Sequence, residues 1–348
     1  MRRFRLLLSV VVAVLLTAIN ASGQQAREPA EVRRGQLQRV IEVQERYTRQ
    51  LVSNPLVFGT GVSVDQSGRG MVKVFTRAAG VRGVPRRLEG IDIVVEEMEP
   101  FMALHTFHAG TSGGTAVAAA AFDTTARYRP APVGVSTGHP DITAGTIGAR
   151  VKDVWGNVYA LSNNHVYANV NAASIGDNVL QPGAFDGGID PDDAFGTLWD
   201  FVPLKPGIFQ VNVVDAAIAL SSAGELDNAT PPDGYGVPRS QPVAARVNMP
   251  VMKYGRTTGL TKGRISAINV FTIVGYGPDY YLWFDRQILI SGSGFSGGGD
   301  SGSLVVAARG AIARRPVGLL FAGNSTTTLA NPIGAVLNQL GVTIDGEG

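Results

Sequence analysis

The chain has 348 residues, of which 45% are hydrophobic and 17% are charged, and its formal net charge is +2. This length and apolar content suffice to bury a sizeable core, while the nearly balanced charge excludes the basic surface that a nucleic-acid-binding protein needs. There is no cysteine, which excludes disulfides, thiolate catalysis and cysteine-ligated zinc. The 44 glycines and many short runs of Val, Ile, Tyr and Phe predict strands joined by tight turns.

The first 23 residues have the pattern of a cleavable secretion signal. Three arginines within residues 2–5 precede an apolar run over residues 6–18, and the small residues Ala21-Ser22-Gly23 follow it. The run is shorter than the roughly 20 residues that span a bilayer, which favours cleavage over the alternative of an uncleaved anchor. Loss of the three arginines changes the formal charge from +2 to −1. We therefore expect a secreted or periplasmic protein, without stable membrane insertion once the signal (residues 1–23) is removed.

The pattern of apolar residues over 24–104 predicts a small N-terminal α/β domain, which is propeptide-like or accessory. Apolar side chains recur at helical spacing within residues 27–54, and apolar runs at 56–64, 71–76 and 91–98 predict three strands. No cluster of His, Asp and Glu at metal-ligand spacing occurs in this stretch of the sequence.

Residues 105–132 are rich in Gly, Ala, Thr and Pro, a composition typical of a linker. His105 and His108 lie at its start and are spaced like a pair of metal ligands. A metal site needs a third histidine or carboxylate, and the sequence has none close by. We therefore expect no metal and no cofactor.

The remaining residues, 133–348, alternate between apolar runs and turn signals. One closing helix is predicted over residues 333–340. Strands are predicted at 145–154, 158–161, 195–202, 211–220, 244–254, 263–274, 280–290, 303–306 and 317–322. Many short strands at even spacing indicate a mainly β domain, an antiparallel barrel or sandwich.

Ser301 lies in a glycine-rich loop over residues 297–302 that leads directly into an apolar strand. A serine hydroxyl is unreactive at neutral pH unless an imidazole takes its proton and a third group orients that imidazole. Glycines beside such a serine let backbone N–H groups turn toward a developing oxyanion.

Two upstream residues could supply the base and its orienting group. His165 follows an apolar strand, and Asp215 interrupts the apolar run over residues 211–220. Taken alone, a buried structural histidine and a water-facing carboxylate are the commoner interpretations. Their order along the chain, His, Asp, Ser, is that of the chymotrypsin arrangement, so the three residues together predict a catalytic triad.

These motifs resemble those of the chymotrypsin-like (trypsin-like) serine proteases of bacterial type, over about residues 133–344. The nucleophile motif is Gly299-Asp300-Ser301-Gly302, and the histidine and aspartate motifs are residues 161–166 and 214–220. Residues 317–323 and 329–332 resemble the last strands beside the specificity pocket. The resemblance implies a chymotrypsin-like double antiparallel β-barrel over residues 133–348, preceded by the small N-terminal α/β domain.

The resemblance also implies an exported serine endopeptidase that hydrolyses peptide bonds through an acyl-enzyme intermediate. Ser301 would attack the carbonyl, His165 would transfer the proton, and Asp215 would orient the imidazole. By the family's layout, the backbone N–H groups of Gly299 and Ser301 form the oxyanion hole, and Asp300 braces the loop.

Substrate-binding residues are also implied by position in the family's layout. They are Phe295, Ser296, Phe321, Gly323 and Thr328. Because no acidic residue is among them, we expect a protein or peptide substrate with an uncharged or apolar residue before the scissile bond.

Some features leave alternatives open. The chain has no Ile-Val-Gly-Gly start, and Val133-Gly134-Val135-Ser136 is the nearest stretch that cleavage could turn into a new N-terminus for Asp300. The acidic residues of 186–193 suggest either a calcium loop or a solvated turn, and Lys253 is not expected to act as a base. The alternative function is a protease-fold binding or scaffold module with little or no hydrolytic activity.

Overall fold

The computed structural model describes residues 30–104, 122–207 and 210–348. The predicted signal and the histidine pair at 105 and 108 lie outside these residues. The described chain is mainly β, as predicted, and two large sheets contain most of its strands. Within the described residues, the helices are all too short or too polar to cross a bilayer.

The N-terminal residues form one helix packed on a small set of strands. The helix α1 spans Gln38–Val52 and follows the 3-10 turn η1, Arg34–Leu37, so it is shorter than the predicted range. The strands are β1 Val32–Arg33, β2 Val57–Val64, β3 Gly70–Thr76, β4 Arg87–Leu88, β5 Ile91–Glu97 and β6 Phe101–Ala103. Apolar side chains one and three residues apart in α1, among them Val40 and Ile41, are buried against β2 and β3, as the helical spacing requires.

The smaller sheet has six strands in the order β11-β12-β14-β10-β9-β22. Their bounds are β9 Ala149–Lys152, β10 Val158–Ser162, β11 Asn178–Leu180, β12 Ala194–Phe201, β14 Ala217–Ser221 and β22 Thr343–Ile344. Beside it lie β7 Ser136–Thr137, β8 Gly145–Thr146 and the short helices α2 Asn164–Tyr167, η2 Asn169–Asn171 and η3 Ala184–Asp186. The strand predicted over residues 145–154 is divided into β8 and β9. Between them lies Gly148, where a Cβ would lie 2.2 Å from the Gly302 carbonyl oxygen.

The larger sheet has twelve strands along the path β13-β18-β21-β20-β19-β16-β17-β2-β3-β5-β4, with β6 paired to both β17 and β20. The strands not yet given are β13 Val211–Asn212, β16 Pro250–Gly255, β17 Gly259–Gly275, β18 Tyr281–Ser291, β19 Leu304–Ala307, β20 Pro316–Gly323 and β21 Thr327–Pro332. The strand β15, Arg246–Val247, pairs with β1, the 3-10 turn η4 is Gly310–Ile312, and the closing helix α3 is Ile333–Leu340, the predicted range.

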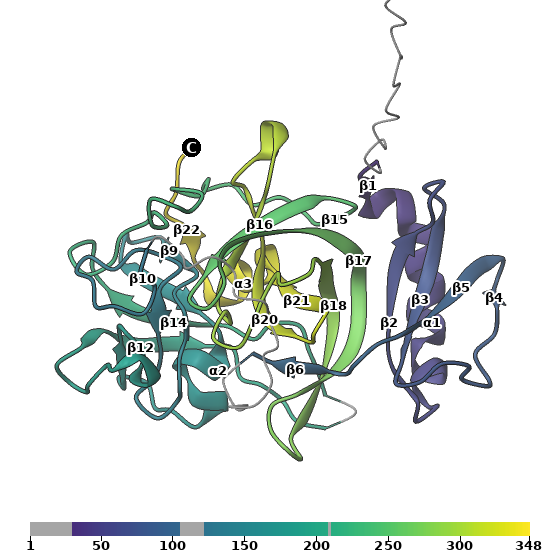
Figure 1. Cartoon of the computed structure of the whole chain (residues 1–348), viewed down its shortest axis with the longest axis horizontal. Coiled ribbons are helices and arrows are strands. Elements are labelled where there is room, and N and C mark those ends of the chain that lie inside the picture. The colour runs from purple at the N-terminus through teal and green to yellow at the C-terminus, as the bar shows by residue number, and fades with distance from the viewer. Residues whose placement is uncertain (1–29, 105–121, 208–209) are drawn as a thin grey trace, which may run out of the picture.

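The N-terminal strands continue the larger sheet instead of forming a separate one. In Figure 1, β2 and β3 stand beside the long, curved β17, and β6 runs from them toward the centre of the molecule. Ile268 of β17 pairs with Val62 of β2. Gln44 of α1 donates to Thr60 (2.8 Å), while its side-chain oxygen accepts from Asn269 of β17 (2.9 Å). The N-terminal region is therefore hydrogen-bonded to the larger sheet through both its strand and its helix.

Residues 122–132, which the sequence places in the linker, pack against the smaller sheet. The Ala131 N–H donates to the Glu225 carbonyl (2.8 Å), and the Arg129 guanidinium forms an ion pair with the Glu225 carboxylate (2.6 Å). Phe122 stacks on Tyr128 with 4.8 Å between ring centroids. This part of the chain is therefore fixed to the body of the molecule.

Candidate functional site

The histidine and aspartate of the predicted triad form a buried hydrogen-bonded pair. His165 lies in α2, directly after β10, and its Nδ1 is 2.6 Å from Asp215 Oδ2. The other carboxylate oxygen, Oδ1, accepts the backbone N–H of His165 at 3.2 Å. Both side chains have no exposed surface. The carboxylate therefore contacts the histidine through ring and backbone at once, which fixes the direction of the imidazole.

The position of Asp215 corrects one expectation and excludes one alternative. It does not lie within a strand, because β13 ends at Asn212 and β14 begins at Ala217. Side chains instead of a neighbouring strand satisfy its backbone: its N–H donates to Asn331 Oδ1 (3.1 Å), and Asn163 Nδ2 donates to its carbonyl (2.7 Å). A water-facing carboxylate is also wrong, since Asp215 is fully buried.

A further residue of this group, Tyr276, has no signal in the sequence motifs. It follows β17, and its hydroxyl donates to Asp215 Oδ2 at 2.6 Å, while its ring meets the His165 ring edge-on at 5.8 Å. Burial and the nearby Asp215 carboxylate raise the pKa of Tyr276 well above its ordinary value. The phenol therefore stays protonated at neutral pH and can donate to Asp215.

The Ser301 loop meets the histidine segment through the short strand β8. The Thr146 N–H donates to the Ser301 carbonyl (2.8 Å), and a Cβ on Gly145 would lie 2.6 Å from Val166, the neighbour of His165. The Ser301 hydroxyl is buried and donates to the Phe321 carbonyl at 3.2 Å. The three predicted triad residues thus lie in one region, where the two sheets meet.

The loop before Ser301 requires glycine. Gly299 has φ +94°, a conformation that residues with a side chain rarely adopt, and a Cβ there would lie 2.6 Å from Thr257 Oγ1. This conformation turns the Gly299 N–H toward the Leu104 carbonyl oxygen, to which it donates at 2.7 Å. The predicted oxyanion donor therefore holds a carbonyl oxygen of the chain itself.

Asp300 is buried beneath this loop and is fully hydrogen-bonded. Its Oδ1 accepts the backbone N–H of Thr257 (2.9 Å) and that of Thr258 (3.2 Å), and its Oδ2 accepts the Gly297 N–H (2.9 Å) and the Thr258 hydroxyl (2.7 Å). The Lys253 ammonium lies 3.4 Å from Oδ2 and is also fully buried. Burial lowers the pKa of Lys253, and the Asp300 charge partly offsets this effect.

Lys253 supplies a cation for Asp300, in the role that a new N-terminus at Val133 would otherwise have. Its ammonium is held by the Thr258 hydroxyl and by the Gly259 carbonyl (3.0 Å), so it faces Asp300 with its own bonds satisfied. Val133 is buried, and its N–H donates to the Ala229 carbonyl at 3.0 Å within the continuous chain. The buried charge of Asp300 is therefore paired without a chain end at Val133.

Three of the predicted pocket residues lie together. The Ser296 and Thr328 hydroxyls are 2.6 Å apart, and a Cβ on Gly323 would lie 3.6 Å from Ser296 Oγ. Phe321 contributes its carbonyl, while its ring packs on Phe284 with 4.7 Å between centroids. Phe295 lies deeper: it is 1% exposed and belongs to the hydrophobic core below the loop.

The acidic turn over residues 186–193 is held by partners from the protein. The Asp186 carboxylate pairs with the Arg256 guanidinium, and Asp193 pairs with Arg127 at 2.7 Å. Asp190 accepts from Asn178 at 2.6 Å. In the described residues, 30–104, 122–207 and 210–348, no group of three His, Cys, Asp or Glu side chains could hold a metal ion.

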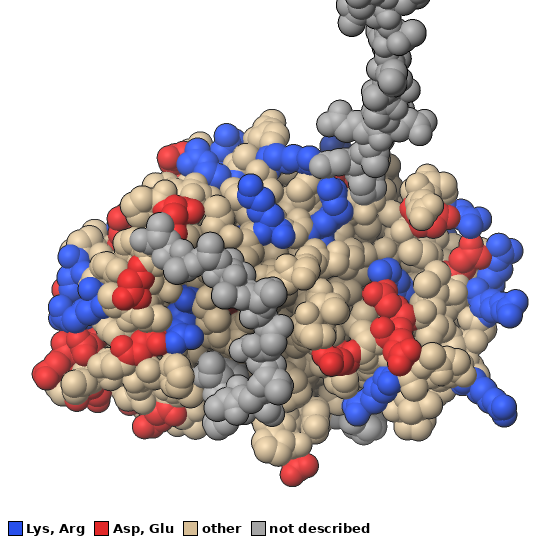
Figure 2. Space-filling view, viewed as in Figure 1, with Lys and Arg blue, Asp and Glu red and all other residues tan. Residues whose placement is uncertain are grey.

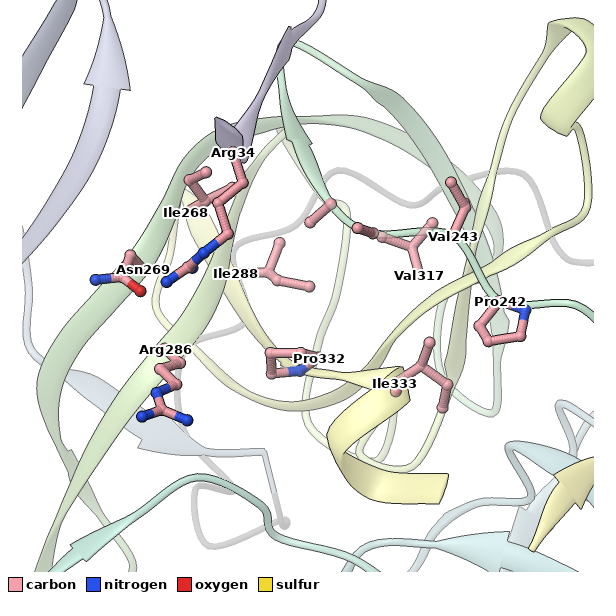
Figure 3. Close-up of a pocket in the computed structure, with 13 residues that line it drawn as sticks. Arg34, Pro242, Val243, Ile268, Asn269, Arg286, Ile288, Val317, Pro332 and Ile333 are labelled. Carbon is pink, nitrogen blue, oxygen red and sulfur yellow. The ribbon is translucent and has the colours of Figure 1, made fainter. Parts of the chain in front are cut away.

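Two cavities differ in their relation to this site. One, of about 650 Å³, opens beside His165 and is also lined by Tyr276 and Phe185. The other, of about 270 Å³, lies between η1, β18 and α3 (Figure 3), and its lining includes Arg34, Ile288 and Ile333 but none of the predicted triad. Only the first is placed to receive a molecule that His165 could contact.

The surface seen in Figure 2 carries both signs of charge side by side. Acidic and basic side chains alternate over the N-terminal strands, where Arg87 pairs with Asp92 and Lys73 with Glu96. The charge is therefore mixed over the N-terminal strands, whereas basic side chains predominate along the upper part of this face.

Comparison with known proteins found similarity among solved structures. No protein-family model and no curated protein sequence matches the chain. A glutamic acid specific serine protease is 21% identical, with a TM-score of 0.44, over 61% of this chain and 99% of its own. Thermobifida fusca Protease A is 17% identical, with a TM-score of 0.44, over 62% and 97%. Nocardiopsis Protease is 20% identical, with a TM-score of 0.43, over 61% and 97%. These are bacterial chymotrypsin-like serine proteases, the family that the sequence motifs resemble.

Proposed function

We propose that this chain is an exported serine endopeptidase, with a chymotrypsin-like double β-barrel over residues 133–348. The observation that carries the proposal is the buried bond between His165 Nδ1 and Asp215 Oδ2, at 2.6 Å. A histidine that served only to fill the core would not need a fully buried carboxylate, because burying that charge costs several kcal/mol, on the order of the Born penalty after relaxation. The cost is understandable where an imidazolium must form and be stabilised.

The proposed mechanism follows from the donors and acceptors present. With Nδ1 bonded to Asp215, the His165 Nε2 takes the Ser301 proton as Oγ attacks a substrate carbonyl. Asp215 stabilises the resulting imidazolium, and Tyr276 keeps the carboxylate in place. The Gly299 N–H donates to the oxyanion, and His165 then delivers the proton to the leaving amine. Water completes the cycle by hydrolysing the acyl-enzyme.

The competing function is a binding or scaffold module that retains the fold but hydrolyses little. One observation favours weak activity in the intact chain: the Gly299 N–H already holds the Leu104 carbonyl. The residues His165, Asp215 and Ser301 would be of no use to such a module, and keeping a buried charged pair would cost it stability.

Labelling with a fluorophosphonate probe separates the two functions. We expect the wild-type chain to be labelled at Ser301 and Ser301→Ala to remain unlabelled. Ser303→Ala is the matched control, because Ser303 lies in the same loop but its hydroxyl donates to the Asp300 carbonyl at 2.6 Å. Labelling that survives in Ser301→Ala would overturn the enzyme proposal. So would the absence of labelling both in the wild type and in a variant in which the Leu104 carbonyl no longer occupies the Gly299 N–H.

Export is tested separately. Expression of the full chain in a bacterium should place the protein in the periplasm or medium, with an N-terminus close to Gln24. A protein that is recovered in the cytoplasm with Met1 intact would contradict this part of the proposal.

A further inference from the structure

The segment over residues 101–104 lies in the predicted substrate site as a bound peptide would. Met102 pairs with Gly323 and Ala103 with Ala322, both antiparallel, so β6 adds a strand to the end of β20 that lies beyond its pairing with β19. The next residue continues the pattern, since the Leu104 N–H donates to the Phe321 carbonyl at 3.1 Å. Main-chain pairing of this kind is how an extended peptide binds to a sheet edge.

The Leu104 carbonyl lies where the carbonyl of a substrate's scissile bond would react. Its oxygen accepts the Gly299 N–H at 2.7 Å, the donor predicted to stabilise an oxyanion. The Ser301 hydroxyl donates to the same Phe321 carbonyl that receives the Leu104 N–H. The Leu104 N–H and the hydroxyl of the proposed nucleophile thus share one acceptor, the Phe321 carbonyl.

The Leu104 side chain lies against the predicted pocket residues. Its Cδ1 is 3.5 Å from the position that a Cβ on Gly323 would take, and Ser296 Oγ is 3.6 Å from that same position. Leu104 also packs against the hydrophobic core that contains Phe295. The site therefore holds a branched apolar side chain, in agreement with a pocket that carries no acidic residue.

The alternation of side chains sets this register. Phe101 is 1% exposed and meets the rings of Phe58 and Phe75 edge-on, at 5.9 and 6.3 Å, whereas Met102 is 36% exposed. Sliding the strand by one residue would move Phe101 to the outer face, because side chains in a strand alternate. The burial of Phe101 therefore determines that Leu104, and not a neighbour, reaches Gly299.

We infer that Ser301 cleaves its own chain at the peptide bond that follows Leu104, and that leucine or a similar branched apolar residue is accepted before the scissile bond. The inference rests on the proposed function. Ser301 Oγ bonds to the Leu104 carbonyl carbon as the C–N bond breaks, and the Ser301 proton passes through His165 to the leaving amine. Water then cleaves the ester, which restores the Ser301 hydroxyl and leaves Leu104 as a C-terminal carboxylate.

Intact-mass measurement of the purified full chain tests the inference. The wild type should separate on denaturation into a fragment that ends at Leu104 and one that begins at residue 105, while Ser301→Ala should remain whole. The rate should not depend on protein concentration, and a small amount of wild type should leave added Ser301→Ala uncut, because each chain occupies its own site.

Substitutions at the apolar contact test the substrate class. Leu104→Asp should slow the cleavage at least about 100-fold, because the pocket offers the carboxylate no partner, whereas Leu104→Met should retain it within about tenfold. Leu56→Asp is the matched control, since Leu56 is 43% exposed on the N-terminal region and should leave the rate unchanged. Because residues 101–104 should bind the substrate site less tightly in Leu104→Asp, this variant should also react faster with the fluorophosphonate probe than the wild type does before cleavage.

The outcomes of these experiments separately test the self-cleavage, its intramolecular step and the proposed function. A chain that is labelled at Ser301 but stays whole, or is cut elsewhere, overturns the inference and leaves the proposed function standing. Cleavage of Ser301→Ala by added wild type after Leu104 overturns the intramolecular step. If neither the wild type nor Leu104→Asp is labelled or cut, the proposed function fails and the inference fails with it.

Discussion

The proposed triad and the Ser301 loop each contain a buried carboxylate, and the two carboxylates have different partners. Asp215 contacts the imidazole of His165, together with the hydroxyl of Tyr276. Asp300 contacts the Lys253 ammonium, two backbone N–H groups of the segment 257–258 and that of Gly297. Both carboxylates are fully buried, so burial alone does not distinguish their roles.

The partners indicate what each carboxylate does. A carboxylate beside an imidazole can stabilise a charge that appears only during a reaction, whereas one beside an ammonium and several amides holds a fixed shape. We therefore expect the contacts of Asp215 to determine turnover and those of Asp300 to contribute to the free energy of unfolding. Each substitution below should change one of these quantities more than the other.

The largest effect is expected from Asp215→Asn. The amide keeps the size of the side chain but cannot stabilise an imidazolium or hold His165 in the required tautomer, so turnover of a peptide substrate should fall by about 10⁴-fold. Steady-state kinetics with a leucine-containing chromogenic peptide gives the measurement. A loss of less than about tenfold would mean that another group orients His165.

The next effect concerns stability. Lys253→Met leaves the Asp300 charge buried without its cation and should lower the free energy of unfolding by about 3–5 kcal/mol, while the double variant Lys253→Met with Asp300→Asn should recover much of the loss. Denaturant unfolding in a Ser301→Ala background keeps the chain whole during the measurement. The control is Arg87→Met, which removes an exposed pair with Asp92 and should cost less than about 1 kcal/mol.

Tyr276→Phe should lower turnover by about 10- to 100-fold, because a hydrogen bond to a charged group contributes roughly 1.5–3 kcal/mol. The phenyl ring preserves the packing on His165, so the unfolding free energy should fall by no more than the roughly 1.5–3 kcal/mol of the lost hydrogen bond. Tyr281→Phe removes an exposed hydroxyl from β18 and should change neither quantity. Turnover of Tyr276→Phe that stays within about threefold of the wild type at a temperature well below the unfolding midpoint would show that the hydroxyl serves only the fold.

The smallest effect is expected from Thr258→Val. This variant deletes one hydroxyl from the Asp300 and Lys253 group and leaves three backbone N–H donors on the carboxylate, so the unfolding free energy should fall by about 1–3 kcal/mol. Turnover at a temperature well below the unfolding midpoint should stay within about threefold of the wild type. A turnover loss comparable to that of Tyr276→Phe would remove the distinction between the two carboxylates.

Much of the fold could be predicted from local patterns. The apolar run that becomes β20 and the closing helix Ile333–Leu340 are short segments whose side-chain periodicity is set by their own burial. The Ser301 loop was recognisable for a similar reason, because a positive φ at Gly299 restricts the residue at that position.

The unpredicted features depend on contacts between distant segments. Tyr276 is an ordinary strand-end tyrosine until the fold brings its hydroxyl to Asp215, which is 61 residues away in sequence. Lys253 is one lysine in a strand, and only its burial against Asp300 shows what it does. The run Phe101-Met102-Ala103-Leu104 is too short to predict a strand, and its partners in β20 lie more than 200 residues further along the chain.

The pairing of β2 with β17 has a consequence for what happens after a cut at Leu104. Breaking that peptide bond removes none of the hydrogen bonds between the two strands, nor those that join Gln44 to Asn269. The two pieces therefore separate only by dissociation, a process that depends on how dilute the protein is. In a concentrated stock, a chain cut after Leu104 should stay inhibited by its own N-terminal fragment, and it should gain activity per molecule on dilution. The strand pairing thus sets the rate at which the N-terminal fragment is released.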